Sequence, residues 1–73
     1  MSQEETQINI DPVLRGLDNI SVLSDEMHFK VLMVTGGVGE QYLVSPMHTK
    51  QIYLLFKKEI EEYEKKFGEI KTN

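Results

Sequence analysis

The stretch that decides the fold is residues 45–70, SPMHTKQIYLLFKKEIEEYEKKFGEI, because it carries the only long helical periodicity in the chain. Ser45 is a favourable N-cap, and Pro46 fits the first helical position, where no amide hydrogen bond is lost. Two lysines lie in the last turn beside the negative end of the helix dipole, and Gly68 suits a left-handed C-cap. We therefore predict a single helix of about six turns at 3.6 residues per turn.

An apolar stripe follows one side of the predicted helix when residues are placed at ~100° intervals. It consists of Ile52, Leu55, Phe56, Ile60, Tyr63 and Phe67. Met47 and Leu54 fall together on the opposite, charged side, and Glu59 interrupts the edge of the stripe. A helix that is apolar nearly all round in its first half is buried on all sides. We therefore predict that a second copy of the chain supplies one wall, with an interface formed by Met47, Ile52, Leu54, Leu55 and Phe56.

Short strands are predicted before the helix, because apolar and polar residues alternate there. The predicted strands are 7–10, 19–23, 27–34 and 40–44. Residues 13–17 fit either a helical turn or an extended segment bent at Gly16, and we favour the extended segment. The glycine-rich residues 35–39 form a five-residue loop that joins the last two strands as an antiparallel hairpin. The predicted fold is thus α+β: a small antiparallel sheet of three to four strands, followed by one long C-terminal helix packed on it. One helix cannot cover four strands, which is a second argument for a homodimer.

Length and composition limit the fold and the class of function. Seventy-three residues form one small domain, which we place at 7–70 between flexible tails at 1–6 and 71–73. Such a chain buries only about 60–65% of its unfolded surface, so its core alone gives marginal stability. Association with another chain is a common source of additional stability. The chain has no cysteine and two histidines, and we expect neither a metal nor a cofactor. Since it has neither a signal peptide nor ~18 consecutive apolar residues, we expect a cytoplasmic protein without a membrane span.

Motifs that could carry chemistry are scarce. Gly36-Gly37-Val38-Gly39 meets neither the phosphate-loop pattern nor the dinucleotide fingerprint, so we interpret it as a turn. His48 lies in the first helical turn, where the positive end of the dipole disfavours its charged form. No spacing of Ser, His and Asp supports a nucleophile. We predict that the protein is not an enzyme, and assign no catalytic residue.

The helix resembles the small bacterial proteins of domain-of-unknown-function family 3467. The residues that carry the resemblance are Ser45, Pro46, His48, Lys50, Tyr63, Glu64, Gly68, Glu69 and Ile70, with 7–10 at the start of the chain. That family usually has basic residues before the proline step, where this chain has Gly39-Glu40-Gln41-Tyr42. The resemblance implies the fold and a bacterial, archaeal or viral cytosolic origin, and it implies no activity.

Three functions are compatible with these features. We favour a homodimeric protein-interaction module, either an adaptor or a small inhibitor of the kind that mobile elements encode. The alternative is a protein that binds a small ligand or nucleotide in a pocket at the dimer interface, lined by Tyr42, His48 and Tyr53. A nucleic-acid-binding hairpin has the least support, because the net charge is −4 and a basic patch is absent from the sequence.

Overall fold

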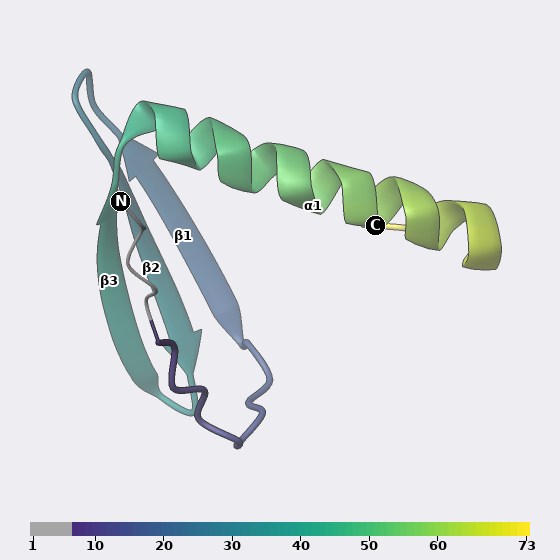
Figure 1. The fold of residues 1–73 in the computed structure, drawn as a ribbon, viewed down its shortest axis with the longest axis horizontal. Coiled ribbons are helices and arrows are strands. Elements are labelled where there is room, and N and C mark those ends of the chain that lie inside the picture. The colour runs from purple at the N-terminus through teal and green to yellow at the C-terminus, as the bar shows by residue number, and fades with distance from the viewer. Residues whose placement is uncertain (1–6) are drawn as a thin grey trace.

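The computed structural model describes residues 7–73, and the predicted tail at 1–6 lies outside them. The described residues form three strands and one helix: β1 (Asn19–Ser24), β2 (Phe29–Thr35), β3 (Val38–Val44) and α1 (Pro46–Phe67). Figure 1 shows a narrow sheet from which the helix extends at one end. The predicted α+β arrangement, antiparallel strands followed by a C-terminal helix, is confirmed.

The sheet has the order β1-β2-β3, and both pairs of neighbours are antiparallel. Residues directly opposite each other in such a sheet point to the same face. Ile20 pairs with Met33, and Val31 pairs with both Val22 and Tyr42. The apolar sheet face therefore consists of Ile20, Val22, Ser24, Phe29, Val31, Met33, Thr35, Val38, Glu40, Tyr42 and Val44. The other side is the mixed sheet face, with Asn19, Ser21, Leu23, Lys30, Leu32, Val34, Gly39, Gln41 and Leu43.

The hairpin between β2 and β3 is tighter than predicted. Thr35 pairs with Val38, so only Gly36 and Gly37 form the loop, with φ of 58° and 79°. Positive φ at both central residues defines a type I′ turn, which matches the twist of antiparallel strands. The predicted five-residue loop at 35–39 is wrong, because two glycines suffice and Gly39 already belongs to β3.

The connection between β1 and β2 is organised by Asp25. Its carboxylate accepts hydrogen bonds from the backbone N–H groups of Met27 and His28, both at 2.8 Å. The N–H of Asp25 donates to the carbonyl of His28 at 3.0 Å, which closes the turn. Hydrogen bonds to the ionised form favour it, so these two N–H groups hold the pKa of Asp25 below its usual value.

Two predicted extended segments do not join the sheet. Residues 7–10 form no strand, and residues 13–17 are irregular. The Asp11 carboxylate accepts from the N–H of Val13 at 3.0 Å and from Arg15 at 3.3 Å, so a local turn replaces strand pairing there. The chain reaches the sheet at Asp18, whose N–H donates to the Val34 carbonyl and whose carboxylate accepts from Gly36 N–H.

The helix begins and ends where the caps predicted. The Ser45 hydroxyl accepts from the N–H of His48 at 3.1 Å, and Thr49 Oγ1 donates to the Ser45 carbonyl at 2.8 Å. Ser45 has φ −68° and ψ 156°, the extended conformation that a following proline imposes. At the other end Gly68 has φ 99° and ψ 170°, so it ends the helix without the left-handed helical conformation predicted for it, and its N–H donates to the Glu64 carbonyl at 3.0 Å.

The helix does not lie across the sheet of its own chain. Contacts between elements run from β1 to β2 and from β2 to β3, and α1 has no comparable contact with a strand. Among residues 7–73 none is buried, and those of intermediate exposure are mostly in β2. The expected packing of helix on sheet is thus not made within one chain. The physical reason is the connection, since Ser45 alone separates β3 from α1.

Candidate protein-interaction surface

The apolar stripe of α1 is open to solvent in the single chain. Leu55 and Phe56 are each 66% exposed, Phe67 is 70% exposed, and the other three members are at least one third exposed. The rings of Tyr63 and Phe67 contact each other, with centroids 4.9 Å apart. Exposed apolar side chains gathered on one side of a helix make this stripe a candidate interaction surface.

The five residues predicted at the interface are all exposed, but they lie on two sides of α1. Ile52, Leu55 and Phe56 belong to the apolar stripe, whereas Met47 and Leu54 lie on the opposite side by helical geometry. Met47 is 72% exposed and Leu54 is 50% exposed. We call this pair the second patch. The helix therefore presents two separate apolar surfaces.

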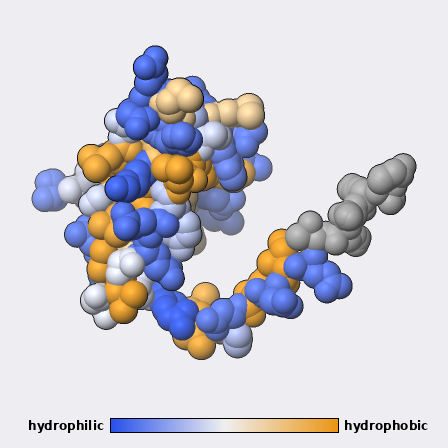
Figure 2. Space-filling view, turned by 90° about the vertical axis from the view of Figure 1, so that its left-hand side faces the viewer, coloured by the Kyte–Doolittle hydropathy of each residue, from blue (hydrophilic) through white to orange (hydrophobic). Residues whose placement is uncertain are grey.

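The apolar sheet face is also incompletely covered. Ile20, Val22 and Tyr42 are each about half exposed, and Val31 in the central strand is only half-buried. Figure 2 shows apolar side chains at the surface of the body and along the segment that precedes β1. Both elements of the fold thus carry apolar surface that the chain itself does not cover.

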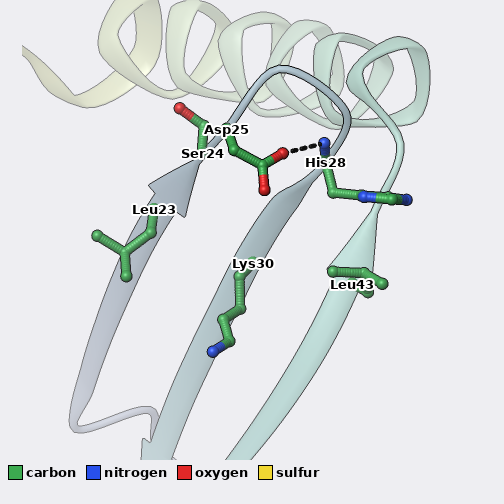
Figure 3. A pocket seen from close by; sticks show the side chains of 6 residues that line it. All are labelled: Leu23, Ser24, Asp25, His28, Lys30 and Leu43. Carbon is green, nitrogen blue, oxygen red and sulfur yellow. Dashed lines mark hydrogen bonds between the residues drawn. The ribbon is translucent and has the colours of Figure 1, made fainter.

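The mixed sheet face carries a shallow hollow beside the β1–β2 turn. Figure 3 shows Leu23, Lys30 and Leu43 projecting from three neighbouring strands, with Asp25 at the upper end. One oxygen of the Asp25 carboxylate, Oδ1, is engaged by two backbone N–H groups that close the turn. The hollow has a floor of two leucines and one lysine, and Ser24, Asp25 and His28 line its upper end.

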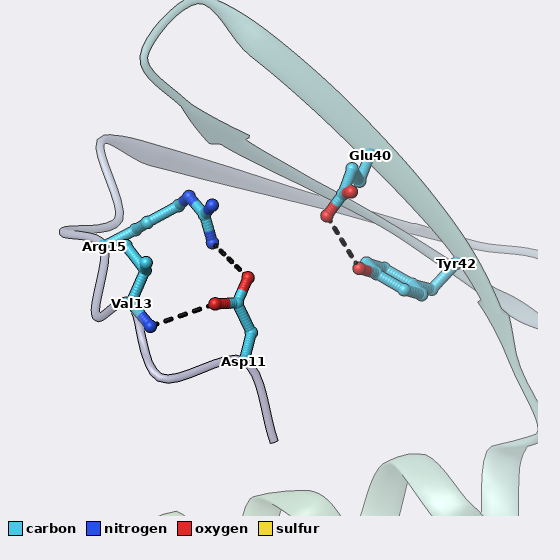
Figure 4. Close-up of polar contacts among 5 residues, drawn as sticks. All are labelled: Asp11, Val13, Arg15, Glu40 and Tyr42. Carbon is cyan, nitrogen blue, oxygen red and sulfur yellow. Dashed lines mark hydrogen bonds and ion pairs between the residues drawn. The ribbon is translucent and has the colours of Figure 1, made fainter. Parts of the chain in front are cut away.

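A second hollow lies at the Gly36 end of the apolar sheet face, under the segment that contains Asp11 and Arg15. Figure 4 shows two separate polar pairs near it: Asp11 with Arg15, and Glu40 with Tyr42. The Tyr42 hydroxyl donates to Glu40 at 3.0 Å, and this bond and the carboxylate charge raise the pKa of Tyr42. All four side chains are at the surface, so these pairs contribute little to stability.

None of the three residues predicted to line a ligand pocket lines either hollow. Tyr42 comes from β3, while His48 and Tyr53 come from the first half of α1. The backbone N–H of His48 is used in the helix cap. A ligand site at a dimer interface stays a prediction.

The charged side of α1 carries an exposed ion pair. Lys57 Nζ lies 2.7 Å from Glu61 Oε2, which raises the pKa of Lys57 and lowers that of Glu61. Exposed pairs of this kind contribute little to stability. Within 7–73, no three His, Asp or Glu side chains come close enough to share a metal ion. In the same residues, charges interrupt the helix too often for it to cross a membrane.

Comparison with known proteins adds no relative. A scan with protein-family models finds no match to this chain, and searches of curated proteins and of solved structures find none either. The assignment to domain-of-unknown-function family 3467 is therefore wrong. Several of the residues that carried the resemblance have general structural roles: Ser45 caps the helix, Pro46 opens it and Gly68 ends it. Any helix with these ends would show the same pattern.

Proposed function

We propose that this protein is a non-catalytic protein-interaction module that acts as a homodimer. The observation that carries the proposal is the uncovered apolar stripe of α1, which occurs together with an uncovered apolar sheet face. A chain of this size gains too little stability from its own core to offset apolar surfaces that stay exposed to water. We therefore expect these surfaces to be buried by association with another chain.

The polar side chains of the described residues support binding over chemistry. Asp25 closes a turn, Asp18 holds the Gly36 turn, and Ser45 caps the helix. Each of these groups is used to fix the backbone. They leave a rigid sheet and a rigid helix, which suit the presentation of a binding surface.

We assign the binding of another protein to the second patch. Met47 and Leu54 are exposed on the side of α1 opposite the stripe, so they remain accessible when the stripe is covered. Lys50 and Lys58 flank this patch, as does Lys57, which is paired with Glu61. A rim of charges around apolar residues is typical of non-obligate interfaces. A partner with an apolar groove and acidic margins would fit it.

The test begins with native mass spectrometry of protein purified gently from its own host. We expect a dimer, and a dimer bound to a further polypeptide when the partner is retained. The Leu54→Lys variant should keep the dimer and lose that polypeptide, whereas Gln51→Lys, of equal charge, should keep both. A monomeric chain would overturn the homodimer, and equal partner binding by both variants would overturn the role of the second patch.

A further inference from the structure

We infer that α1 of each chain covers the apolar sheet face of a second copy, so that the homodimer forms by reciprocal exchange of the helix. This inference rests on the proposed function, because it specifies how the proposed homodimer is assembled. Four features of the chain carry it: the link between β3 and α1, the fit of the two apolar surfaces, the exposed area and the symmetry of the pairing.

The link holds the helix away from its own sheet. Connections between a strand and a helix usually have about two to six residues, whereas here Ser45 stands alone. Pro46 restricts Ser45 to an extended conformation, and the hydrogen bonds of the cap fix the first turn at 3.1 and 2.8 Å. A short and rigid hinge of this kind favours exchange of the element that follows it. In Figure 1 the greater part of α1 extends beyond the strands.

The apolar stripe and the apolar sheet face have matching dimensions. Strands about 4.8 Å apart make a three-stranded sheet roughly 10 Å wide between its outer strands. A helix with its side chains is also about 10 Å across, so one helix covers three strands. The 22 residues of α1 span about 33 Å, which exceeds the ~24 Å length of a seven-residue strand. One helix per sheet is therefore sufficient cover for the part of this face that the segment containing Asp11 and Arg15 leaves open.

The exposed area is in the range that an obligate dimer removes. The chain exposes 7088 Å², whereas a folded monomer of 8.5 kDa exposes about 4700 Å². Part of the difference of about 2400 Å² lies in residues 7–18, which precede β1 and are exposed throughout. If association buries half of this excess area on each of the two chains, the dimer buries about 2400 Å² in total. Obligate homodimers bury about 2000–5000 Å².

Exchange also covers both apolar surfaces in one symmetric step. Two chains related by a two-fold axis bury two identical helix–sheet contacts, as an isologous interface requires. A dimer built from two helices alone would cover the stripe and leave Val22, Val31 and Tyr42 in water. In the exchanged dimer the second patch stays outside, where the proposed function needs it.

Cysteine cross-linking tests the exchange directly, because the chain has no cysteine of its own. Chains that carry Ile60→Cys in the stripe are mixed, through unfolding and refolding, with differently tagged chains that carry Val31→Cys in the apolar sheet face. A short bismaleimide is then added. Within a dimer the two thiols meet at an effective concentration of about 1 mM, so at about 10 μM protein their cross-linking should be roughly 100-fold faster than between free chains.

Lys30→Cys serves as the matched control, because it is adjacent in β2 and points to the mixed sheet face. We expect the product of Ile60→Cys with Val31→Cys to exceed the product with Lys30→Cys at least about tenfold, because the sheet separates Lys30→Cys from the exchanged helix and the gain in effective concentration is lost where geometry forbids contact. Sedimentation of the unmodified chain as a monomer would overturn the proposed homodimer as well as the exchange. A dimer that links Ile60→Cys only to itself would leave the homodimer standing and overturn the exchange.

Discussion

Removal of one ring from the apolar stripe should weaken the dimer by orders of magnitude. Phe56 is 66% exposed in the single chain, so about two thirds of its burial takes place only on association. Truncation of a fully buried Phe to Ala costs about 3–5 kcal/mol, and two thirds of the lower value is about 2 kcal/mol. The symmetric dimer contains two such sites, which gives about 4 kcal/mol, and 1.4 kcal/mol corresponds to tenfold in Kd. Phe56→Ala should therefore raise the dissociation constant about 1000-fold.

Sedimentation equilibrium over a wide range of protein concentration measures this constant, with far-UV circular dichroism to record helix content. Lys58→Ala is the control, because Lys58 lies on the charged side of α1 and exposed substitutions usually change stability by less than about 0.5 kcal/mol. Over two sites this allows about a fivefold change in Kd. If Phe56→Ala dimerises as tightly as Lys58→Ala, the stripe is not the interface and the reasoning is refuted.

Three further predictions concern the local structures that shape the surface. Gly37→Ala should lower the free energy of unfolding by about 1 kcal/mol, because a side chain is strained at φ of 79°. Gly37→Asn should lower it by less, because Asn tolerates positive φ better than Ala. A melting temperature of Gly37→Asn below that of Gly37→Ala would contradict the turn assignment. Ser45→Ala should cost about 1 kcal/mol through loss of the cap, while Ser45→Asp should keep the acceptor and the melting temperature; equal melting of all three chains would show that the cap contributes nothing. The pKa of Asp25 is lowered in the folded chain, so its contribution is present above the unfolded pKa of about 3.9 and is lost as pH falls through the lower folded value. The difference in Tm between the natural chain and Asp25→Asn should therefore be constant at neutral pH and shrink below pH ~4; a difference that does not change with pH would exclude the charge of Asp25 as its cause.

The sequence predicted the helix well because its signals are local. Ser45, Pro46 and Gly68 act on the backbone within one turn of themselves, so their effect does not depend on the rest of the fold. The strands β1 and β2 were placed correctly for a similar reason, since alternation over five or more residues is a strong pattern. The hairpin was misjudged at Gly39, because a glycine next to a turn has the same local signal whether it belongs to the loop or to the strand.

The errors concern contacts between distant parts of the chain. Residues 7–10 alternate like a strand, yet a strand exists only when a partner edge is available, and Asp11 turns the chain before one is reached. The stripe on α1 indicates that another apolar surface packs against the helix. The periodicity does not indicate whether that surface belongs to the same chain or to a second one. The feature that bears on this question is the length of the link. Ser45 alone between a strand and a helix is visible in the sequence once the ends of both elements are known.

The division of α1 into two apolar sides connects the fold with the proposed function. Phe56 and Leu54 are separated by about 160° around the helix, so one surface cannot contact both. If both were needed for the dimer, α1 would have to lie between two sheets, and each chain supplies only one within the described residues. In the proposed exchanged dimer the stripe therefore contacts the second copy, whereas the second patch contacts neither chain. In the proposed dimer, one side of α1 would stabilise the fold by covering the sheet of the second copy. The other side would leave Leu54 exposed for a protein partner.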